Sequence, residues 1–472
     1  MNDAIMRKSL TITKIFFLFI LFTISAYGCK KSTPAIVDPP KPPVVVKDTD
    51  PVQYGVPFDK VPDRRDVSLY QVNMRVFSSG GNLNGVTDRL DSIKALGVNV
   101  IYLMPIYPVG VAKSVNSPYC VKDYKSVGAE FGTLEDLRAL VAGAHSRNMS
   151  VLLDWVANHT SFDHTWINDR SWYMQDASGN IVSPPGMGWN DVAQLNFNSS
   201  AMRQAMIKAM KYWVFTANVD GFRFDYSDGP PVDFWQQAVD TLRNISSHKL
   251  LLLAEGTQSA NYSAGFDYNF GFGFFDKLKG IYSSNQSVKQ IDNLNSSDYT
   301  GASDGQQIVR YLTNHDVNSS DGTPLELFGG KMGSMAAFVV VSYMKSIPMI
   351  YNGQEVGTPI RMTFPFTSAK INWTINPDVT AEYKRILAFR NSSMAVRRGQ
   401  PTSYSNDDVC VFTKESGTEK VLVVSNLRNS SMVYTLPANL KNTTWKDAFT
   451  GISTTLSTTI SLQPFSYMVL KN

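Results

Sequence analysis

The sequence has few cysteines, little excess charge and no long apolar run, and each absence excludes a class of protein. Three cysteines in 472 residues cannot form the disulfide framework of a small secreted domain. Lysine and arginine number 44 against 40 aspartates and glutamates, a net charge of +4, so the basic excess of a nucleic-acid-binding protein is missing. A mean hydropathy of −0.15 excludes a polytopic membrane protein. With 43% hydrophobic and 18% charged residues, the chain is expected to be globular.

Residues 1–28 have the pattern of a secretory signal peptide. Arg7, Lys8 and Lys14 precede the apolar run Ile15–Ile24, which is shorter than the roughly 20 residues that a membrane-spanning helix needs. Small residues then lead to Cys29. This ending resembles a bacterial lipoprotein signal, which makes Cys29 the lipidated first residue of the mature chain. An ordinary signal peptide with an incidental cysteine is the alternative.

Residues 29–58 are expected to form a proline-rich linker, because prolines recur there without an apolar period. A lipid on Cys29 would then be the only membrane contact, in the bacterial cell envelope. Lys30 and Lys31 do not resemble the acidic export signals that some bacteria use to reach the cell surface, so a periplasm-facing anchor is preferred to a surface one. The other two cysteines, Cys120 and Cys410, are expected to be free.

Residues 59–397 alternate between apolar strand patterns and helical patterns. Near-continuous apolar strands between helices predict an α/β fold, a (β/α)8 TIM barrel, with an open doubly wound sheet as the competing arrangement. The expected strands are Val67–Phe77, Val98–Pro108, Ser150–Val156, Val219–Asp225, Leu250–Glu255, Gly265–Phe270, Gln307–Thr313 and Ile347–Tyr351. The clearest helices are Thr133–Arg147, with Asp136 placed for a near capping box, Ala201–Ala217, Pro231–Ile245, with Pro231 in the first turn, and Lys331–Lys345.

Two regions interrupt this alternation. Residues 160–200 are too long for an ordinary strand–helix loop of about 2 to 6 residues, so a small subdomain is expected after the third strand, over the barrel mouth. Residues 398–472 contain strand patterns separated by turns and no helix, which predicts a separate C-terminal all-β sandwich domain. Its expected strands are Val409–Thr413, Lys420–Ser425, Met432–Leu436 and Tyr467–Leu470.

Three acidic residues fall at strand ends, where a parallel barrel builds its chemistry. Asp225, Glu255 and Asp316 each close an apolar run, so their side chains are expected to converge. Arg223 lies two residues before Asp225, and the period of two in a strand places both side chains on one face. The adjacent guanidinium favours the ionised form of Asp225, as a nucleophile requires.

Glu255 follows the most apolar of these runs, and desolvation there would raise its pKa, as a general acid requires. Two carboxyl groups in such different environments suit glycosidic bond cleavage, and a separation of about 5 to 5.5 Å would give retention through a covalent glycosyl-enzyme. Asp316 would stabilise the oxocarbenium-like transition state. His145, His164 and His248 match no catalytic motif and are expected at the surface.

Four segments resemble the signature regions of the α-amylase family, glycoside hydrolase family 13, in that family's order. They are Asp154-x-x-x-Asn158-His159, Gly221-Phe222-Arg223-x-Asp225, Glu255 and Asn314-His315-Asp316. The resemblance implies that Asp225 is the nucleophile, Glu255 the acid/base and Asp316 the transition-state stabiliser. It also implies a sugar subsite with Tyr119 as its stacking platform, and the expected substrate-binding residues are Tyr119, Asp154, His159, Arg223, Tyr226 and His315.

The sequence departs from the family pattern at two places. Asp228-Gly229 stand where many α-amylases have Lys-His, and Gln194 replaces an Asp. By the resemblance these positions supply calcium ligands and a contact to the leaving side. Asn158 is then the only clear metal ligand, which is too few for a cation that binds 6 to 8 oxygens. No cofactor is therefore expected to be required, and calcium has little support.

Three hypotheses about function remain. The first is a monomeric, retaining hydrolase of α-1,4-glucosidic bonds in starch-type glucans or maltooligosaccharides. The second keeps the mechanism but makes the enzyme an α-glucosidase, a cyclodextrin or pullulan hydrolase, or a transglycosylase. The third is an inactive glucan-binding lipoprotein, which the presence of all three carboxylates disfavours.

Overall fold

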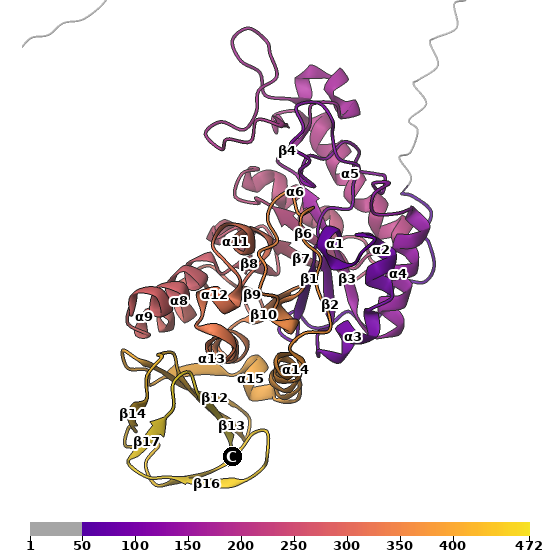
Figure 1. Cartoon of the computed structure of the whole chain (residues 1–472). Coiled ribbons are helices and arrows are strands. Elements are labelled where there is room, and N and C mark those ends of the chain that lie inside the picture. The colour runs from indigo at the N-terminus through magenta and orange to yellow at the C-terminus, as the bar shows by residue number, and fades with distance from the viewer. Residues whose placement is uncertain (1–49) are drawn as a thin grey trace, which may run out of the picture. The chain divides into compact units, whose positions relative to one another are not determined.

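A closed barrel of parallel strands forms the core of the computed structural model, which describes residues 50–472 (Figure 1). Around the barrel the strands follow the order β1-β10-β9-β8-β7-β6-β3-β2. They are β1 (Leu69–Val72), β2 (Val100–Leu103), β3 (Ser150–Val156), β6 (Gly221–Asp225), β7 (Leu251–Ala254), β8 (Tyr268–Phe270), β9 (Gln307–Tyr311) and β10 (Ile347–Tyr351). The prediction of a (β/α)8 barrel is therefore confirmed, and the open doubly wound sheet is wrong.

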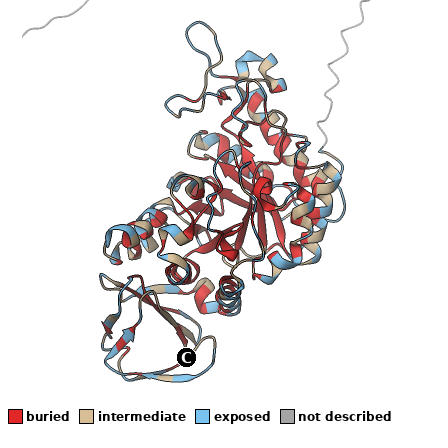
Figure 2. Cartoon of the chain, in the orientation of Figure 1, coloured by how far each residue is buried: buried red, intermediate tan, exposed pale blue. Residues whose placement is uncertain are grey.

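The strands are buried on both faces, which explains their near-continuous apolar sequences. All seven residues of β3 are buried, and Figure 2 shows the buried barrel inside a layer of helices whose outer sides are exposed. Neighbouring strands approach each other closely at Gly221. This residue has φ +145°, and a Cβ there would lie 1.9 Å from the carbonyl oxygen of Leu251, so only glycine can begin β6.

The first expected strand, Val67–Phe77, is wrong in its second half. Strand β1 ends at Val72, and Met74–Phe77 form the short helix α1. Asn73 marks the change of direction, and its side-chain amide donates to the hydroxyl of Tyr351 at 3.0 Å. Every residue of α1 is buried, so its apolar sequence looks like a continuation of the strand.

Helices connect the strands and begin close to the expected positions. The capping box of Thr133 and Asp136 starts α4, as predicted, whereas Pro231 is the N-cap of α6 rather than part of its first turn. The longer helices are α4 (Leu134–Ser146), α5 (Ser200–Ala217), α6 (Val232–Arg243), α8 (Phe272–Ser284), α13 (Gly330–Tyr343) and α14 (Pro377–Ser392). The shorter ones are α2 (Leu83–Thr87), α3 (Leu90–Ala95), α7 (Ser259–Ser263), α9 (Lys289–Asp292), α10 (Leu294–Ser297), α11 (His315–Ser320), α12 (Pro324–Leu327), α15 (Met394–Arg398) and the 3-10 turn η3 (Gln354–Val356).

The segment after β3 leaves the barrel and returns to it. Strand β4 (His159–Ser161) pairs antiparallel with β5 (Val192–Gln194), and the chain between them contains the 3-10 turns η1 (Thr165–Asn168) and η2 (Arg170–Trp172). This is the excursion expected for residues 160–200.

His145, His164 and His248 were expected at the surface, and this is wrong for His145 and His164. His164 is 3% exposed, and its Nδ1 accepts from the backbone N–H of Trp166 at 3.0 Å. The Nε2 of His145 lies 2.8 Å from the buried carboxylate of Asp220, beneath the barrel. His248 is partly exposed, with Nε2 at 3.2 Å from the side-chain oxygen of Asn218.

The C-terminal domain is all-β, as predicted. A six-stranded sheet in the order β11-β12-β13-β18-β15-β16 is accompanied by the two-stranded sheet β14-β17, and a hydrophobic core that includes Leu422, Tyr434 and Trp445 lies between them. Of these strands, β11, β15, β16 and β17 were not predicted. The strands are β11 (Gln400–Ser403), β12 (Val409–Ser416), β13 (Glu419–Asn426), β14 (Met432–Thr435), β15 (Thr443–Asp447), β16 (Ser453–Leu456), β17 (Thr459–Leu462) and β18 (Tyr467–Lys471).

The signal peptide, Cys29 and most of the linker lie outside the described residues. The end of the expected linker contacts the barrel, because the N–H of Tyr54 donates to the carbonyl of Phe215 at 2.7 Å and Phe58 stacks on His145. Cys120 and Cys410 are buried and unbridged, which confirms that both are free. Between residues 50 and 472 no helix has the length and apolar character needed to cross a membrane.

Candidate active site

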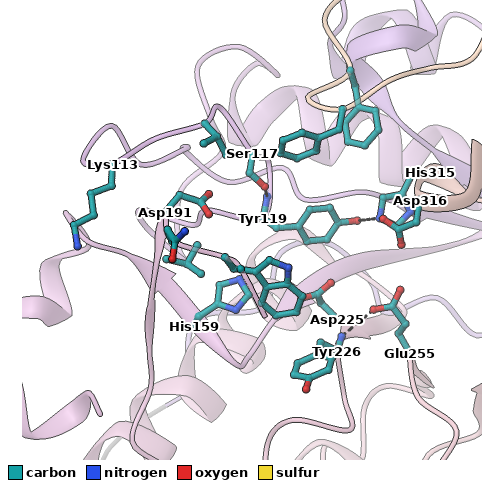
Figure 3. A pocket seen from close by; sticks show the side chains of 17 residues that line it. Lys113, Ser117, Tyr119, His159, Asp191, Asp225, Tyr226, Glu255, His315 and Asp316 are labelled. Atoms are coloured by element: carbon teal, nitrogen blue, oxygen red, sulfur yellow. Dashed lines mark hydrogen bonds and ion pairs between the residues drawn. The ribbon is translucent and has the colours of Figure 1, made fainter. Parts of the chain in front are cut away.

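A cavity of about 710 Å³ opens at the carboxyl ends of the barrel strands and contains most of the predicted site residues (Figure 3). The side chains of Asp225, Glu255 and Asp316 reach it from β6, from the end of β7 and from the start of α11. The convergence expected from the sequence is therefore present. The residues that line the cavity include Ser117, Tyr119, His159, Trp189, Asp225, Tyr226, Glu255, His315, Asp316, Phe364 and Phe366.

Arg223 lies beneath the cavity and connects its carboxylates. The guanidinium is 1% exposed and contacts Asp154 at 2.7 Å, Asp225 at 3.0 Å and the Oε1 of Glu255. Arg223 and Asp225 thus share one face of β6, as the strand period predicts. Asp154 and Arg223, both expected to bind substrate, are buried supports of the residues that face the cavity.

Glu255 is also held by backbone groups of the turn after β6. Its Oε2 accepts the N–H of Tyr226 at 2.9 Å, and its carbonyl accepts the N–H of Ser227 at 3.0 Å. Tyr226 has φ +42°, a left-handed conformation that is unfavourable for a side chain of this size. The strained turn therefore aims an N–H at the carboxylate of Glu255.

Burial controls the protonation of the two inner carboxyl groups. It raises the pKa of Glu255, as expected, with Arg223 opposing the rise. It also raises the pKa of Asp225 well above the usual range, since burial and the charges of Glu255 and Asp154 outweigh Arg223. Arg223 does lower the pKa of Asp225, as expected, but burial outweighs its effect. Burial also raises the pKa of Asp316, with Arg223 opposing the rise, so the three neighbouring carboxyl groups titrate together.

A chain of hydrogen bonds positions His315 and Tyr119. Gln71 Nε2 donates to His315 Nδ1 at 2.9 Å, which places the proton of the neutral ring on Nε2. That nitrogen lies 2.7 Å from the hydroxyl of Tyr119, and the hydroxyl donates to Asp154 at 3.1 Å. Burial lowers the pKa of His315 to about 4, so the ring is neutral around pH 7.

His159 has the same character, because burial lowers its pKa to about 4. The centre of the Trp189 ring lies 5.6 Å from the centre of the His159 ring. The Trp189 ring also meets the ring of Tyr226 edge-on, with 5.2 Å between the ring centres. Trp189 belongs to the loop between β4 and β5, where Gly186 and Gly188 have positive φ. The sequence analysis missed Gln71 and Trp189 as site residues, since neither belongs to a signature region. The glycines around Trp189 were the available signal for a loop.

The residues expected around a calcium ion bind each other instead. Gln194 Nε2 lies 3.2 Å from the side-chain oxygen of Asn158, 3.1 Å from its carbonyl and 3.2 Å from the carbonyl of Leu195. In return, the amide of Asn158 donates to Gln194 Oε1 at 3.2 Å. A nitrogen donor therefore lies among the oxygens that a cation would need, so these residues do not fit calcium. Between residues 50 and 472 no cluster of three or more His, Cys, Asp or Glu side chains could hold a metal ion.

Asp228 also differs from the residue that the family pattern places there. Its carboxylate accepts the N–H of Thr257 at 2.9 Å and the side-chain amide of Asn261 at 3.0 Å. Asp228 thus ties the turn after β6 to the turn that follows Glu255.

Comparison with known proteins agrees with this geometry. The family described as alpha amylase, catalytic domain, matches residues 44–180, and the family described as maltogenic amylase, C-terminal domain, matches residues 402–469. Alpha-amylase 2 of Dictyoglomus thermophilum is 26% identical over 82% of this chain and 70% of that protein. Alpha-amylase 3 of the same organism is 25% identical over 86% of this chain and 93% of its own length.

Solved structures give the same result over both domains. The crystal structure of an alpha-amylase from Lactobacillus plantarum superposes with a TM-score of 0.77 and 25% identity, over 87% of this chain and 99% of that one. The chain is therefore an α-amylase-type glycosidase, in which the catalytic barrel precedes a domain of the maltogenic amylase C-terminal type.

Proposed function

We propose that the protein hydrolyses α-1,4-glucosidic bonds of starch-type glucans or maltooligosaccharides with retention of configuration. The observation that carries the proposal is the meeting of Asp225, Glu255 and Asp316 in one cavity, with Arg223 in contact with the first two. Retaining cleavage needs a nucleophile and a proton donor on opposite sides of the scissile bond. The reaction uses an ionised Asp225 and a protonated Glu255, and neighbouring carboxyl groups that titrate together can hold these two forms at once.

In the first step the carboxylate of Asp225 attacks the anomeric carbon, and Glu255 gives its proton to the departing glycosidic oxygen. In the second step Glu255 takes a proton from water, and the water oxygen displaces Asp225, which releases the α-anomer. His315 and His159 are neutral rings that line the cavity, so they contact the sugar without adding charge. Asp316 stabilises the positive charge that develops on the sugar ring.

The cavity walls favour a polysaccharide or oligosaccharide substrate. Trp189, Tyr226, Phe364 and Phe366 all line the cavity, and the rings of Trp189 and Tyr226 meet edge-on. Aromatic faces suit the apolar faces of glucose units. An α-glucosidase, a cyclodextrin or pullulan hydrolase, or a transglycosylase is the alternative. We expect no cofactor to be required, because the amide of Gln194 takes the place of a cation.

The test follows reducing ends released from soluble starch and from maltoheptaose, with the initial anomer read by NMR. Asp225→Asn should lower kcat by about 1,000-fold or more, while Asp91→Asn, an exposed change of the same kind, should leave it unchanged. Initial α-anomers support retention, and initial β-anomers contradict it. Cleavage of maltoheptaose alone would favour the oligosaccharide-specific alternative, and glucan binding without cleavage would favour the inactive lipoprotein.

We further propose that the enzyme is a monomer, held by a lipid on Cys29 in the bacterial cell envelope and preferentially facing the periplasm. The signal pattern and the cysteine at its end support this anchor. Cys29→Ala should move the protein from the membrane fraction to the soluble fraction. Unchanged partitioning would contradict the anchor.

A further inference from the structure

A second polar cavity, of about 260 Å³, lies at the opposite end of the barrel from the carboxylates, where the barrel meets the C-terminal domain. Lys345, which precedes β10, and Arg65, which precedes β1, contribute from the barrel side. Arg397 and Arg398 come from the end of α15, and Lys414 comes from β12. Five cationic side chains therefore line a space too small for the typical ligand pocket of about 300 Å³ or more.

Carboxylates neutralise only the three arginines of this set. Asp63 accepts from Arg65 at 2.9 Å, and Asp66 pairs with Arg397 at 2.7 Å and with Arg398 at 2.6 Å. Asp304 also lines the cavity, but its side chain is 97% exposed and lies 3.7 Å from Arg65. It therefore gives little compensation to the charges on the inner wall.

The side-chain amines of Lys414 and Lys345 have no carboxylate partner between residues 50 and 472. Lys414 is 3% exposed, and its Nζ donates to the carbonyls of Met344, at 3.3 Å, and Val396. The Nζ of Lys345 lies 4.0 Å from the ring of Tyr299. A buried charge without a counter-ion is expensive.

Neighbouring side chains add further positive charge around this cavity. Arg390 is fully buried near Lys414, and its guanidinium donates to the hydroxyl of Ser68 at 3.0 Å, while its Nε has no partner among the described residues. The Nε of Arg397, which lines the cavity, also has no partner there. Burial and the charges of Arg390, Arg310 and Lys345 lower the pKa of Lys414, so an anion beside this amine would favour its protonated form.

We propose that this cavity binds a small oxyanion of the phosphate type, with Lys414 and Lys345 as its charged partners. A multiply charged oxyanion accepts several charge-assisted hydrogen bonds and would neutralise the inner wall. Because Lys345 belongs to the barrel and Lys414 to β12, the bound anion would strengthen the contact between the two domains. The site is separate from the catalytic cavity and does not depend on the reaction proposed above.

The test measures the melting temperature and the heat of binding of the purified protein with inorganic phosphate, at constant ionic strength set with sodium chloride. Phosphate at about 100 times its Kd should raise the melting temperature by about 3 °C for a unit of this size. Lys414→Met and Lys345→Gln should each abolish the shift and the heat. Lys331→Gln, the same loss of charge at a surface pair with Asp378, should keep both.

Sulfate and glucose 6-phosphate distinguish the sources of the anion. Tighter binding of inorganic phosphate or sulfate would assign the site to a free ion, and tighter binding of the phosphate ester would assign it to an organic phosphate. An equal shift in all variants, or the same shift with chloride alone, would overturn the proposal. Because Lys345 is partly exposed, Lys345→Gln should fold and decides the outcome even if Lys414→Met does not.

Discussion

Glu355 provides a pH-dependent contribution to stability that a single substitution can isolate. It lies in η3 and is 5% exposed; its carboxyl group accepts the hydroxyl of Tyr70 and, at 2.8 Å, the N–H of Gly353. Burial raises the pKa of Glu355 from 4.5 to about 7, although both hydrogen bonds oppose the rise. In the folded protein the carboxyl group therefore keeps its proton in a range where the unfolded chain has lost it.

The sign follows from proton linkage. Between pH 4.5 and pH 7 the folded state binds more protons than the unfolded state at Glu355, so the free energy of unfolding falls as the pH rises and levels off above pH 7. The full pKa difference of about 2.5 units corresponds to about 3.4 kcal/mol. Between pH 5 and pH 8 the expected loss is about 2.5 kcal/mol.

Glu355→Gln should remove this loss, because the amide is neutral at every pH. Urea unfolding of both proteins at pH 5, 6, 7 and 8 measures the effect, and other titrating groups cancel in the difference between them. The variant should gain about 2.5 kcal/mol relative to the wild type from pH 5 to pH 8. Glu135→Gln, at a side chain that is 75% exposed, should show no such gain. Parallel curves for Glu355→Gln and the wild type would refute the reasoning.

Three further substitutions test other parts of the structure. Gly221→Ala should destabilise the protein by about 3 kcal/mol or more because its Cβ has no room, whereas Gly273→Ala, which meets nothing within 4 Å, should be neutral or slightly stabilising in urea unfolding. Chelators should leave the melting temperature of the wild type unchanged, and calcium should raise the melting temperature of the Gln194→Asp variant. A lower melting temperature of the wild type in EDTA would contradict the inference that the amide of Gln194 takes the place of a cation. Tyr119→Phe breaks the hydrogen bonds to Asp154 and His315 and should lower kcat/KM by about 10- to 100-fold; an unchanged value would show that this chain of hydrogen bonds does not matter for the reaction.

The sequence was sufficient for those features that depend on local pattern. Strand β3 matches its expected bounds because every residue is buried and apolar periodicity does not change along it. Thr133 and Asp136 predicted the start of α4 because a capping box is a contact between near neighbours. Asp225, Glu255 and Asp316 could be brought together in advance, since parallel strands end at one rim of the barrel.

Features that depend on distant contacts could not be predicted. Helix α1 follows β1 without any loss of burial, so hydrophobicity alone gives no boundary there. Gln71 faces His315 across 244 positions of the chain, and no local motif connects them. His145 pairs with Asp220 in the same way, which is why a histidine without a motif proved to be structural rather than exposed.

The protonation of Asp225 shows how the same limit affects chemistry. Sequence spacing correctly placed Arg223 beside it, but the effect of that arginine depends on how many carboxylates share the guanidinium. Asp154 and Glu255 also contact Arg223, so one positive charge is divided among three acids in a buried site. Burial outweighs this shared charge, and the pKa values of Asp225 and Glu255 are both raised. The arrangement that weakens Arg223 as a partner of Asp225 therefore favours a protonated carboxyl group beside it, which is the proton donor that the proposed retaining cleavage requires.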